Sequence, residues 1–383
     1  MKLRIIRVVT DPYAVKYHMP NTLSRIGLDF DVLVVGQNVT QFADQYPNIT
    51  FINLKIARKI SLTSDILAVA SLIKIILNFK PDIVHSLMPK ASLVAALAGF
   101  ICRVPVRLHT FTGQVWATKS GLSKYVLRRF DWLVNALNTE CLADSHSQSN
   151  YLYKNGICSK GKPLPVLIKG SLSGVDVTRF NCEILLMDSN KLKLSLNINA
   201  NNFIFAYIAR KTVDKGAVDM LYAFHDTYNK YNHSRLLFVG PDEDGVISEL
   251  KFKTPELFAG VIEIGSVSDP ELYLNVSNVL CLPSHREGFG SIVIDAAALG
   301  IPAIGTKIPG LTDSIIDNET GSLAEFGNVT SFTDLMINYI EQPAQVKIFG
   351  AKARERVNKY FTADIHYEAL KYYYLSFNKS GLV

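Results

Sequence analysis

The sequence predicts an α/β protein with two doubly wound parallel sheets, one in each half of the chain. At about 150 residues per domain, the 383 residues leave room for two domains. Hydrophobic residues make up 48% of the chain and charged residues 19%, which excludes a disordered or fibrous protein. The predicted strands are apolar throughout instead of alternating, as expected for strands buried on both faces of a parallel sheet.

In the first half, short segments rich in Val, Ile and Leu alternate with longer segments of helical length. The predicted strands are 3–9, 31–35, 49–54, 82–85 and 106–110, with helices at 62–79 and 91–101. Strands that alternate with helices in this way indicate βα units and hence a parallel sheet.

The same alternation begins again after a loop that contains Gly161, Pro163 and Pro165. Here the predicted strands are 203–208, 235–239, 261–264, 279–282 and 302–305, and helices begin near 214, 270 and 291. A second βα series indicates a second domain, with a boundary near residues 170–176. We therefore expect domains at 1–170 and 171–360.

The last segment, 361–383, is predicted to contain a C-terminal helix that could pack back on the N-terminal domain. It carries an aromatic stripe that we interpret as core packing, formed by Tyr367, Tyr372, Tyr373, Tyr374 and Phe377.

Targeting signals and cysteine usage indicate a soluble protein of a reducing compartment. The longest uncharged apolar stretch, residues 91–102, has 12 residues, whereas a helix that spans a bilayer needs about 20. Charges interrupt the apolar residues at the N-terminus, which therefore resembles a strand more than a secretory signal. The five cysteines form no C-x-x-C pair, so neither disulfides nor a structural zinc site is expected.

The charge is distributed unevenly between the two halves. Residues 1–170 contain 21 Lys and Arg against 9 Asp and Glu, whereas residues 171–383 contain 19 against 25. A basic half could bind phosphate, an anionic membrane surface or nucleic acid, and an ordinary solvated surface is the simpler alternative.

The most informative stretch is residues 281–302, where a buried strand, a polar loop with two glycines and a helix follow one another. Ligands bind at the carboxyl ends of strands in doubly wound folds. Gly288 and Gly290 allow close approach of the backbone, and the helix start offers N–H groups to an anion. Glu287 lies in the loop and Asp295 in the helix. A simple helix cap is the structural alternative.

A second candidate site follows the first strand of the second half. Arg210, Lys211 and Lys215 place three cations at the end of this strand, immediately before Gly216. They could bind a phosphate, with Arg as a planar fork and Lys as a point charge, or could be solvated charges in a turn.

These motifs resemble those of the retaining GT-B glycosyltransferases of family 4. The pair Glu287 and Asp295 is similar to the family's E-x7-E signature, although the second residue of that signature is usually Glu. Arg210 and Lys215-Gly216 resemble the pair that holds the donor diphosphate. Further matches cover nearly the whole chain, at 81–85, 109–119, 174–180, 238–240, 264–265 and 309–321. The segments 81–85 and 109–119 resemble the subgroup that assembles bacterial surface polysaccharides and lipid-linked oligosaccharides.

The resemblance implies two Rossmann-like domains that face a cleft, and transfer of a hexose or N-acetylhexosamine from a nucleotide diphosphate sugar. A UDP-sugar is the favoured donor, and neither a cofactor nor a metal is expected. The implied catalytic residues are His109 and Glu287, and Asp295 would hold the ribose. His85 has a location like that of His109 and weaker support. The implied diphosphate-binding residues are Arg210, Lys215, Gly288, Phe289 and Gly290.

The acceptor side is predicted from a basic segment of the first half. A basic amphipathic helix with a nearby Trp suits an anionic membrane, where a polyprenyl-diphosphate-linked sugar or another glycan acceptor would be presented. A helix with a solvated charged face is the alternative. The protein is accordingly expected in the cytoplasm, peripheral on the inner face of the cell membrane, without nucleic acid as a partner. The predicted acceptor or membrane residues are Trp116, Lys119, Lys124, Arg128 and Arg129.

Two other classes of protein remain as alternatives. One is a nucleotide-sugar epimerase, a dehydrogenase or another nucleotide-dependent α/β enzyme, although no G-x-G-x-x-G follows the first predicted strand. The other is a non-enzymatic two-domain ligand-binding protein, which would normally carry a secretion signal.

Overall fold

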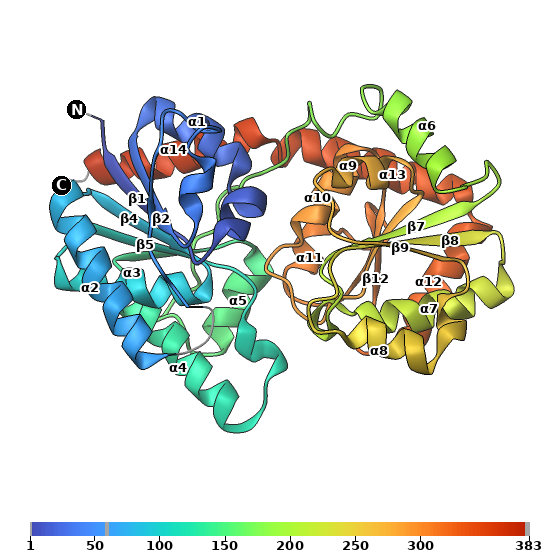
Figure 1. Cartoon of the computed structure of the whole chain (residues 1–383), viewed down its shortest axis with the longest axis horizontal. Coiled ribbons are helices and arrows are strands. Elements are labelled where there is room, and N and C mark those ends of the chain that lie inside the picture. Colours follow the sequence, from blue (N-terminus) through green and yellow to red (C-terminus); the bar gives the residue numbers. More distant parts are fainter. Residues whose placement is uncertain (1, 58–60, 380–383) are drawn as a thin grey trace. The chain divides into compact units, whose positions relative to one another are not determined.

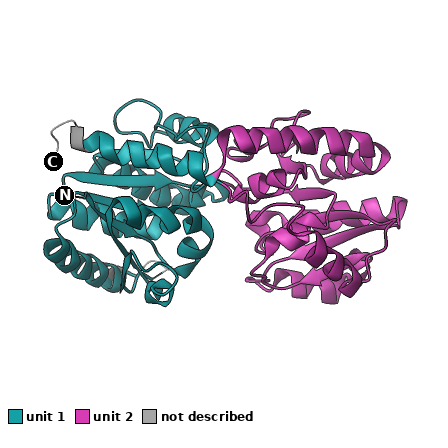
Figure 2. Ribbon diagram, turned by 90° about the horizontal axis from the view of Figure 1, so that it is seen from above, with its two compact units in different colours: residues 1–174, 363–383 teal, residues 175–362 magenta. Residues whose placement is uncertain are grey.

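The computed structural model describes residues 2–57 and 61–379 and divides the chain into two compact units. Unit 1 comprises residues 1–174 and 363–383, and unit 2 comprises residues 175–362 (Figure 2). The first boundary lies a few residues beyond the expected one at 170. The second lies at 362, so the last helix of the chain belongs to unit 1.

Unit 1 contains a six-stranded parallel sheet in the order β3-β2-β1-β4-β5-β6. The strand order reverses between β1 and β4, as in a dinucleotide-binding fold. Its strands are β1 (Arg4–Val8), β2 (Asp31–Gly36), β3 (Thr50–Asn53), β4 (Ile83–Leu87), β5 (Val106–Phe111) and β6 (Glu140–Ala143).

Helices cover both faces of this sheet, which explains why its strands are apolar throughout. Side chains of α2 and α3 bury one face with Ile6 and Val8, whereas α1 and α14 bury the other with Ile5 and Val9. The helices of unit 1 are α1 (Pro20–Asp29), α2 (Leu62–Phe79), α3 (Pro89–Ile101), α4 (Gly121–Leu137), α5 (His146–Lys154) and α14 (Ala363–Lys379), with single turns η1 (Ala14–His18), η2 (Val39–Phe42) and η3 (Val115–Thr118).

Unit 2 repeats the same topology with a second parallel sheet, in the order β12-β11-β10-β7-β8-β9. Here the strand order reverses between β7 and β10, so the first strand of the unit again lies beside the fourth. Its strands are β7 (Phe203–Ile208), β8 (Ser234–Val239), β9 (Val261–Ile264), β10 (Val279–Leu282), β11 (Ala303–Thr306) and β12 (Gly321–Ala324).

Two helical layers also enclose the second sheet. The layer with α7 and α12 packs on Phe205 and Phe238, and the layer with α9, α10 and the second half of α13 packs on Leu280 and Leu282. The helices are α6 (Leu186–Ser195), α7 (Ala217–Lys230), α8 (Val246–Lys253), α9 (Pro270–Asn275), α10 (Ser291–Ala298), α11 (Leu311–Ser314), α12 (Val329–Glu341) and α13 (Pro343–Tyr360), with single turns η4 (Val213–Lys215) and η5 (Pro255–Phe258).

Helix α14 contributes directly to the core of unit 1, where it lies beside α1 (Figure 1). The hydroxyl of Tyr374 accepts a hydrogen bond from Nη1 of Arg7 (2.7 Å) and lies 2.6 Å from Nδ1 of His85. Tyr367 and Phe377 are also buried, so core packing is confirmed for them and for Tyr374. It is wrong for Tyr372, whose side chain is exposed.

The predicted fold class, two Rossmann-like doubly wound domains, is confirmed. Each predicted strand overlaps an observed one within one to three residues. The short edge strands β6 and β12 and several helices, including α1, α12 and α13, were not predicted. Both missed strands mix apolar residues with polar residues or glycine, so their composition resembles that of a loop, whereas the edge strands β3 and β9 have the same length and were predicted.

Candidate active site

The candidate site of unit 2 lies where the strand order of its sheet reverses. β7 and β10 are neighbours in the centre of the sheet, and the segments that leave their carboxyl ends carry the predicted ligand-binding residues. The turn after β7 contains Arg210 and Lys215, and the loop after β10 contains Glu287. Since this is the position at which doubly wound domains bind ligands, the geometry agrees with a binding role.

The buried side chain of Tyr207 stabilises the β7–α7 turn (residues 209–216). Its hydroxyl group donates a hydrogen bond shared between the carbonyl oxygens of Arg210 (2.9 Å) and Lys215 (3.2 Å). Gly216 ends the turn with a φ of 67°, and a Cβ here would lie 1.9 Å from the carbonyl oxygen of Pro283. Only glycine therefore allows the turn to pack this closely against the end of β10.

The β10–α10 loop (residues 283–290) directs Glu287 toward this turn. Oε1 of Glu287 accepts hydrogen bonds from Nζ of Lys215 (2.6 Å) and from the hydroxyl of Ser284 (2.9 Å). The structure thus brings together two predicted site residues that are 72 positions apart in the sequence. Both side chains are largely shielded from solvent, which strengthens their attraction relative to an exposed pair.

Arg210 occupies a different position from Lys215. Its Nη1 lies 2.9 Å from Oε2 of Glu243, in the segment after β8, and both side chains are about one-third exposed. An anionic ligand at this turn would compete with Glu243 for the guanidinium. Sequence reasoning missed Glu243, because nothing in the segment 241–245 distinguishes this carboxylate from Asp242 and Asp244.

The three loop residues predicted to bind the diphosphate differ in which of their groups could contact a ligand. Gly290 precedes α10 with a φ of 81°, and no side chain caps the first turn of this helix. Phe289 is buried and its ring packs 5.4 Å from that of Phe361, so only its backbone could contact a ligand. Gly288 lies between Glu287 and Phe289, and a Cβ at Gly310 would lie 2.6 Å from its carbonyl oxygen, so the loop passes close to Gly310.

Asp295 lies one turn inside α10 and accepts no hydrogen bond from the described residues. Burial raises its pKa from 3.8 to about 7, and the nearby charge of Arg179 opposes this rise. Arg179 itself forms two hydrogen bonds with Glu271, from Nε (2.9 Å) and Nη2 (2.7 Å). The pair Arg179 and Glu271 was not predicted, because its members are 92 residues apart.

His109 lies in unit 1, near the carboxyl end of β5. Its Nδ1 lies 3.1 Å from the carbonyl oxygen of Ser86 and 3.0 Å from the hydroxyl of the same residue. A carbonyl only accepts, so Nδ1 carries the proton and Nε2 is an acceptor. Burial lowers the pKa of His109 to about 3, and the imidazole is therefore neutral. Nε2 has no hydrogen-bond partner among the described residues.

His85 is occupied by the structure of unit 1. Its ring nitrogens bond Tyr374 on one side and the hydroxyl of Thr110 (2.8 Å) on the other. Burial lowers its pKa well below the ordinary value. Both nitrogens are used, so the geometry favours a structural role.

The membrane role predicted for Trp116 is wrong. This residue is only 1% exposed, its indole stacks on Tyr151 at 5.2 Å, and its Nε1 donates to Oδ2 of Asp131 (2.7 Å). Trp116 lies in η3 before α4, and it joins this helix to the rest of unit 1 instead of facing solvent. It cannot insert into a bilayer without unpacking this core.

Helix α4 nevertheless presents apolar and basic groups to solvent. Leu122, Tyr125 and Trp132 are 77%, 61% and 38% exposed, and the guanidinium of Arg129 lies 5.1 Å from the Trp132 ring. Together with Val126, these side chains follow the spacing of one helix face. Lys119, Arg128 and Arg129 are exposed, and Lys124 is half-buried. We call this set the α4 surface: Lys119, Leu122, Lys124, Tyr125, Val126, Arg128, Arg129 and Trp132.

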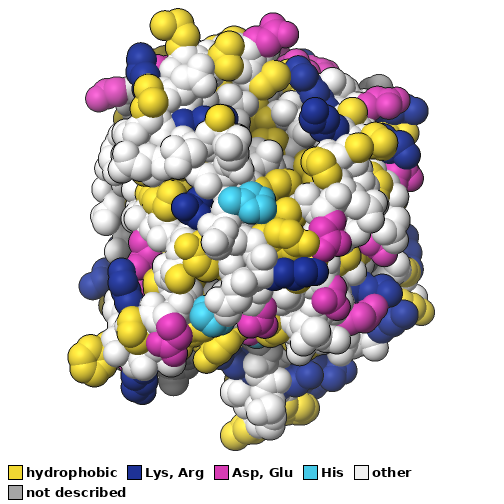
Figure 3. All heavy atoms as spheres, turned by 90° about the vertical axis from the view of Figure 1, so that its right-hand side faces the viewer, with side chains coloured by type: hydrophobic (Ala, Val, Ile, Leu, Met, Phe, Trp, Pro, Cys, Tyr) yellow, Lys and Arg dark blue, Asp and Glu magenta, His cyan; other side chains and the backbone are white. Residues whose placement is uncertain are grey.

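The α4 surface differs in charge from the face of unit 2 in Figure 3, where basic and acidic side chains are interspersed. The only acidic residue of α4 is Asp131, whose carboxylate is bonded to Trp116. The α4 surface therefore presents positive charge without neighbouring carboxylates on its own helix.

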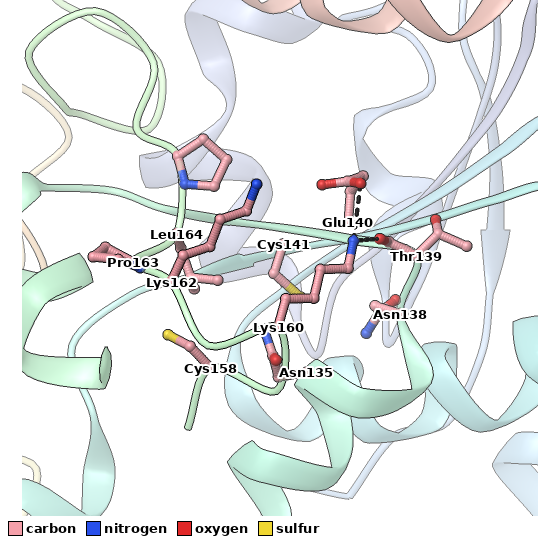
Figure 4. Close-up of a pocket in the computed structure, with 11 residues that line it drawn as sticks. Asn135, Asn138, Thr139, Glu140, Cys141, Cys158, Lys160, Lys162, Pro163 and Leu164 are labelled. Carbon is pink, nitrogen blue, oxygen red and sulfur yellow. Dashed lines mark hydrogen bonds and ion pairs between the residues drawn. The ribbon is translucent and has the colours of Figure 1, made fainter. Parts of the chain in front are cut away.

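A small pocket lies at the amino end of β6, where Nζ of Lys160 bonds Thr139 and Glu140 (Figure 4). Cys141 lines it, and burial raises the pKa of this thiol to about 12, so the thiolate is scarce at neutral pH. The pocket lies at the opposite edge of the sheet from the carboxyl ends of the strands. It is therefore not a candidate for the donor site.

Two parts of the chain match described families. Residues 188–356, in unit 2, match the family "Glycosyl transferases group 1". Residues 12–133, in unit 1, match the family "Glycosyl transferase 4-like". Fold and site thus define a two-domain glycosyltransferase of the GT-B class.

Whole-chain comparisons agree with these matches. The capsular polysaccharide biosynthesis glycosyltransferase CapM of Staphylococcus aureus is 31% identical over 92% of both chains. A UDP-Gal:alpha-D-GlcNAc-diphosphoundecaprenol alpha-1,3-galactosyltransferase of Escherichia coli is 26% identical over 79% of this chain and 77% of its own. The chain belongs to the group 1, family 4-like glycosyltransferases.

Solved structures share the fold. Anabaena Alr3699/HepE in complex with UDP and glucose has a TM-score of 0.81 at 17% identity, covering 98% of this chain and 100% of its own. Sucrose-phosphate synthase from Thermosynechococcus elongatus has a TM-score of 0.82 at 18% identity, covering 99% and 100%.

Within residues 2–57 and 61–379, no helix has both the length and the apolar content that crossing a bilayer requires.

Proposed function

We propose that the protein transfers a hexose or N-acetylhexosamine from a UDP-sugar to a glycan or polyprenyl-diphosphate-linked acceptor, with retention of the anomeric configuration. The reaction would serve the assembly of a cell-surface polysaccharide. CapM, a capsular polysaccharide biosynthesis glycosyltransferase by its description, and the galactosyltransferase that acts on a diphosphoundecaprenol-linked sugar support this choice. The fold neighbour that binds UDP and glucose supports the donor.

The observation that carries the proposal is the contact between Lys215 and Glu287. It joins the cationic turn after β7 to the acidic loop after β10, so that a cation for a diphosphate and a carboxylate for a sugar occupy one site. A phosphate group next to Lys215 would place the attached sugar within reach of Glu287. Neither segment alone would distinguish a glycosyltransferase from another phosphate-binding protein.

The diphosphate leaving group gains negative charge as the bond to the sugar breaks. Arg210, Lys215 and the uncapped start of α10 would meet this charge through preorganised electrostatics. Asp295 would accept hydrogen bonds from the ribose hydroxyls. In this proposal the cations of the protein do the work of a metal ion, so a chelator should leave turnover unchanged.

His109 would act as a hydrogen-bond acceptor for a sugar hydroxyl. Its neutral state and its Nδ1–H tautomer leave the lone pair of Nε2 for this purpose. A histidine with a pKa of about 3 is a poor proton donor at neutral pH, so the role of His109 would be in binding the sugar.

The α4 surface would bring the enzyme to the inner face of the cytoplasmic membrane, where a lipid-linked acceptor is located. Each Lys or Arg near an anionic surface contributes about 1 kcal/mol, and exposed aromatic side chains favour the interface. In this proposal Trp132 and Tyr125 have the membrane-contacting role that the sequence suggested for Trp116.

The experiment is an assay of nucleotide release with a panel of UDP- and GDP-sugars, with and without a lipid-linked acceptor. Acceptor-dependent release of UDP, with a product of retained configuration by NMR, is the expected result. Interconversion of the sugar without an acceptor would identify an epimerase instead. Binding of a nucleotide sugar without any turnover would favour a ligand-binding protein.

A further inference from the structure

Four contacts dock the β10–α10 loop onto the β7–α7 turn and the start of α7. The backbone N–H of His285 donates to the carbonyl oxygen of Asp214 (3.0 Å), and Nε2 of His285 lies 2.7 Å from Oδ2 of Asp219. Nη2 of Arg286 lies 3.2 Å from Oδ2 of Asp214. The fourth contact is the one between Lys215 and Glu287. The three consecutive loop residues 285–287 therefore all contact the opposite segment, at Asp214, Lys215 and Asp219.

These contacts differ in how they would respond to a bound donor. The pair of Lys215 and Glu287 consists of groups that would themselves touch the diphosphate and the sugar, so a ligand weakens or shares it. The bond of His285 with Asp219 uses no group that we place against the donor. Asp219 lies in the first turn of α7, where its negative charge also interacts favourably with the positive end of the helix dipole.

His285 is well placed to fix the conformation of the loop. Its backbone and its side chain are both bonded, so the peptide cannot rotate without breaking two contacts. The ring also meets Phe326, which follows β12, edge to face at 5.5 Å. Glu287 is two residues further along, and its carboxylate can keep its position only while this peptide segment does.

The charged groups that face His285 come from two elements. Asp219 of α7 and Asp214 of η4 are both acidic, and Phe326 contributes a neutral ring. The hydrogen bond with Asp219 raises the pKa of His285, and its partial burial opposes the rise. The pair is therefore an ion pair below this raised pKa. As the pH rises through it, the imidazole loses its charge and can only donate a weaker hydrogen bond from neutral Nε2–H to the carboxylate.

We propose that His285, held by Asp219, is a positioning residue that keeps Glu287 in place when the donor diphosphate competes for Lys215. This inference rests on the proposed function, because it assigns a task to that site. The contact between His285 and Asp219 makes the loop after β10 rigid, and the substrate does not replace this contact.

The test compares His285→Ala, His285→Gln and Asp219→Asn in the full-length protein. His285→Ala should lower kcat by roughly ten- to hundredfold, as loss of one hydrogen bond to a charged partner would, with a smaller change in the KM for the donor. His285→Gln should recover most of this loss, because its amide nitrogen can donate to Asp219. The control variant is His225→Ala. His225 lies on α7, as Asp219 does, and its ring forms hydrogen bonds with Asn229 and the carbonyl oxygen of Glu256.

Two further readouts separate positioning from general stability. Amide hydrogen exchange at residues 286–290 should become faster in His285→Ala and not in His225→Ala. The kcat of the parent should decline as pH rises through the pKa of His285, whereas that of His285→Gln should not. If exchange and kcat in His285→Ala equal those of the parent, or if His225→Ala loses as much, the inference is wrong. If the parent transfers no sugar, the proposed function fails, and the exchange measurement alone decides the role of His285.

Discussion

Each of the two cations that we assign to the donor diphosphate already has a carboxylate partner. Lys215 bonds Glu287, and Arg210 bonds Glu243. In the function that we propose, an incoming diphosphate would exchange with these carboxylates. The two cations would then already be held at the site before the donor arrives.

Lys215→Ala and Arg210→Ala should each lower kcat/KM by about 10²–10³ fold, because each removes a positioned charge from the leaving group. Steady-state release of UDP measures the effect. Lys230→Ala is the control, since this exposed lysine forms an ion pair with Glu341 at the opposite end of α7. Full activity in both site variants would remove the diphosphate from this turn.

Replacing Asp295 by Asn should stabilise the fold at alkaline pH and weaken binding of the donor. The pKa of Asp295 in the folded protein, about 7, lies above the ordinary 3.8, so the folded state holds the proton more tightly. The free energy of unfolding therefore falls as pH rises from about 4 to 7. Asp295→Asn removes this cost and should raise the Tm at pH 8 by roughly 2–4 °C, yet weaken binding of UDP.

Calorimetric titration with UDP and thermal melting at pH 5 and pH 8 measure these two effects. At pH 5 the Tm of Asp295→Asn should approach that of the parent. Asp295→Glu should bind UDP at least as well as the parent if the ribose site tolerates the longer side chain. A Tm that rises equally at both pH values would contradict a titrating carboxyl at this position.

At the residue scale, the sequence predicts the side chains that we propose for the donor site, and it misses the residues that support them in the structure. Glycines, Lys215 and Glu287 occur in short motifs with recognisable spacing. Arg179, Glu271 and His285 act through partners from 66 to 92 positions away, and no local pattern marks such pairs.

At the scale of the element, α4 shows why a tryptophan near basic residues can mislead. Trp116 belongs to η3, and its buried indole binds Asp131 of α4. The exposed apolar residues of α4 recur at intervals of three and four, so their face could have been found from periodicity, with Trp132 as its aromatic member.

Two tryptophan variants should therefore have different effects. Trp116→Ala removes a buried indole and leaves Asp131 without its donor, and should lower the free energy of unfolding by about 3–5 kcal/mol. Trp132→Ala should change it by less than about 0.5 kcal/mol but weaken binding to anionic vesicles. Chemical denaturation and vesicle flotation give the two quantities. Equal loss of stability in both variants would show that α4 has no free face.

Charge reversal tests the same surface electrostatically. Replacing Lys124, Arg128 and Arg129 by Glu should abolish binding to anionic vesicles and preserve activity on a short water-soluble acceptor. High salt should release the parent, since added ions screen the attraction. The matched control reverses Lys347, Lys352 and Lys359, three exposed lysines of α13. If the α4 variant floats as well as the parent, this helix face is only solvated.

At the scale of the whole molecule, the two successive series of strands and helices are the part of the fold that the sequence predicts best. Composition identifies ten of the twelve strands as apolar segments, of which the edge strands β3 and β9 are only partly buried. The sequence does not determine with which unit α14 folds, because its aromatic residues could equally pack on either sheet. Its membership in unit 1 depends on contacts such as that of Tyr374 with Arg7, 367 residues away.

Unit 1 should not fold stably as residues 1–174 alone. Without α14, the side chains of α1 and β1 that contact Tyr367, Leu370 and Tyr374 would face water, and the buried guanidinium of Arg7 would lose its hydroxyl partner. A fragment that joins residues 1–174 to 363–383 by a flexible linker should melt cooperatively, whereas 1–174 should aggregate or show no transition in calorimetry. A cooperative melt of 1–174 would show that α14 is dispensable.

This arrangement also has a consequence for synthesis on the ribosome. The first unit to emerge cannot be completed until α14 has been translated. At about 5–20 residues per second, all of unit 2 takes roughly 10–40 s to emerge, and during this delay the nascent first unit exposes an apolar face. The second unit, although it is made later, is contiguous and can finish folding first. We therefore expect newly made chains to depend on chaperones that shield the N-terminal part, and C-terminal nonsense mutations to damage the domain that was translated earliest.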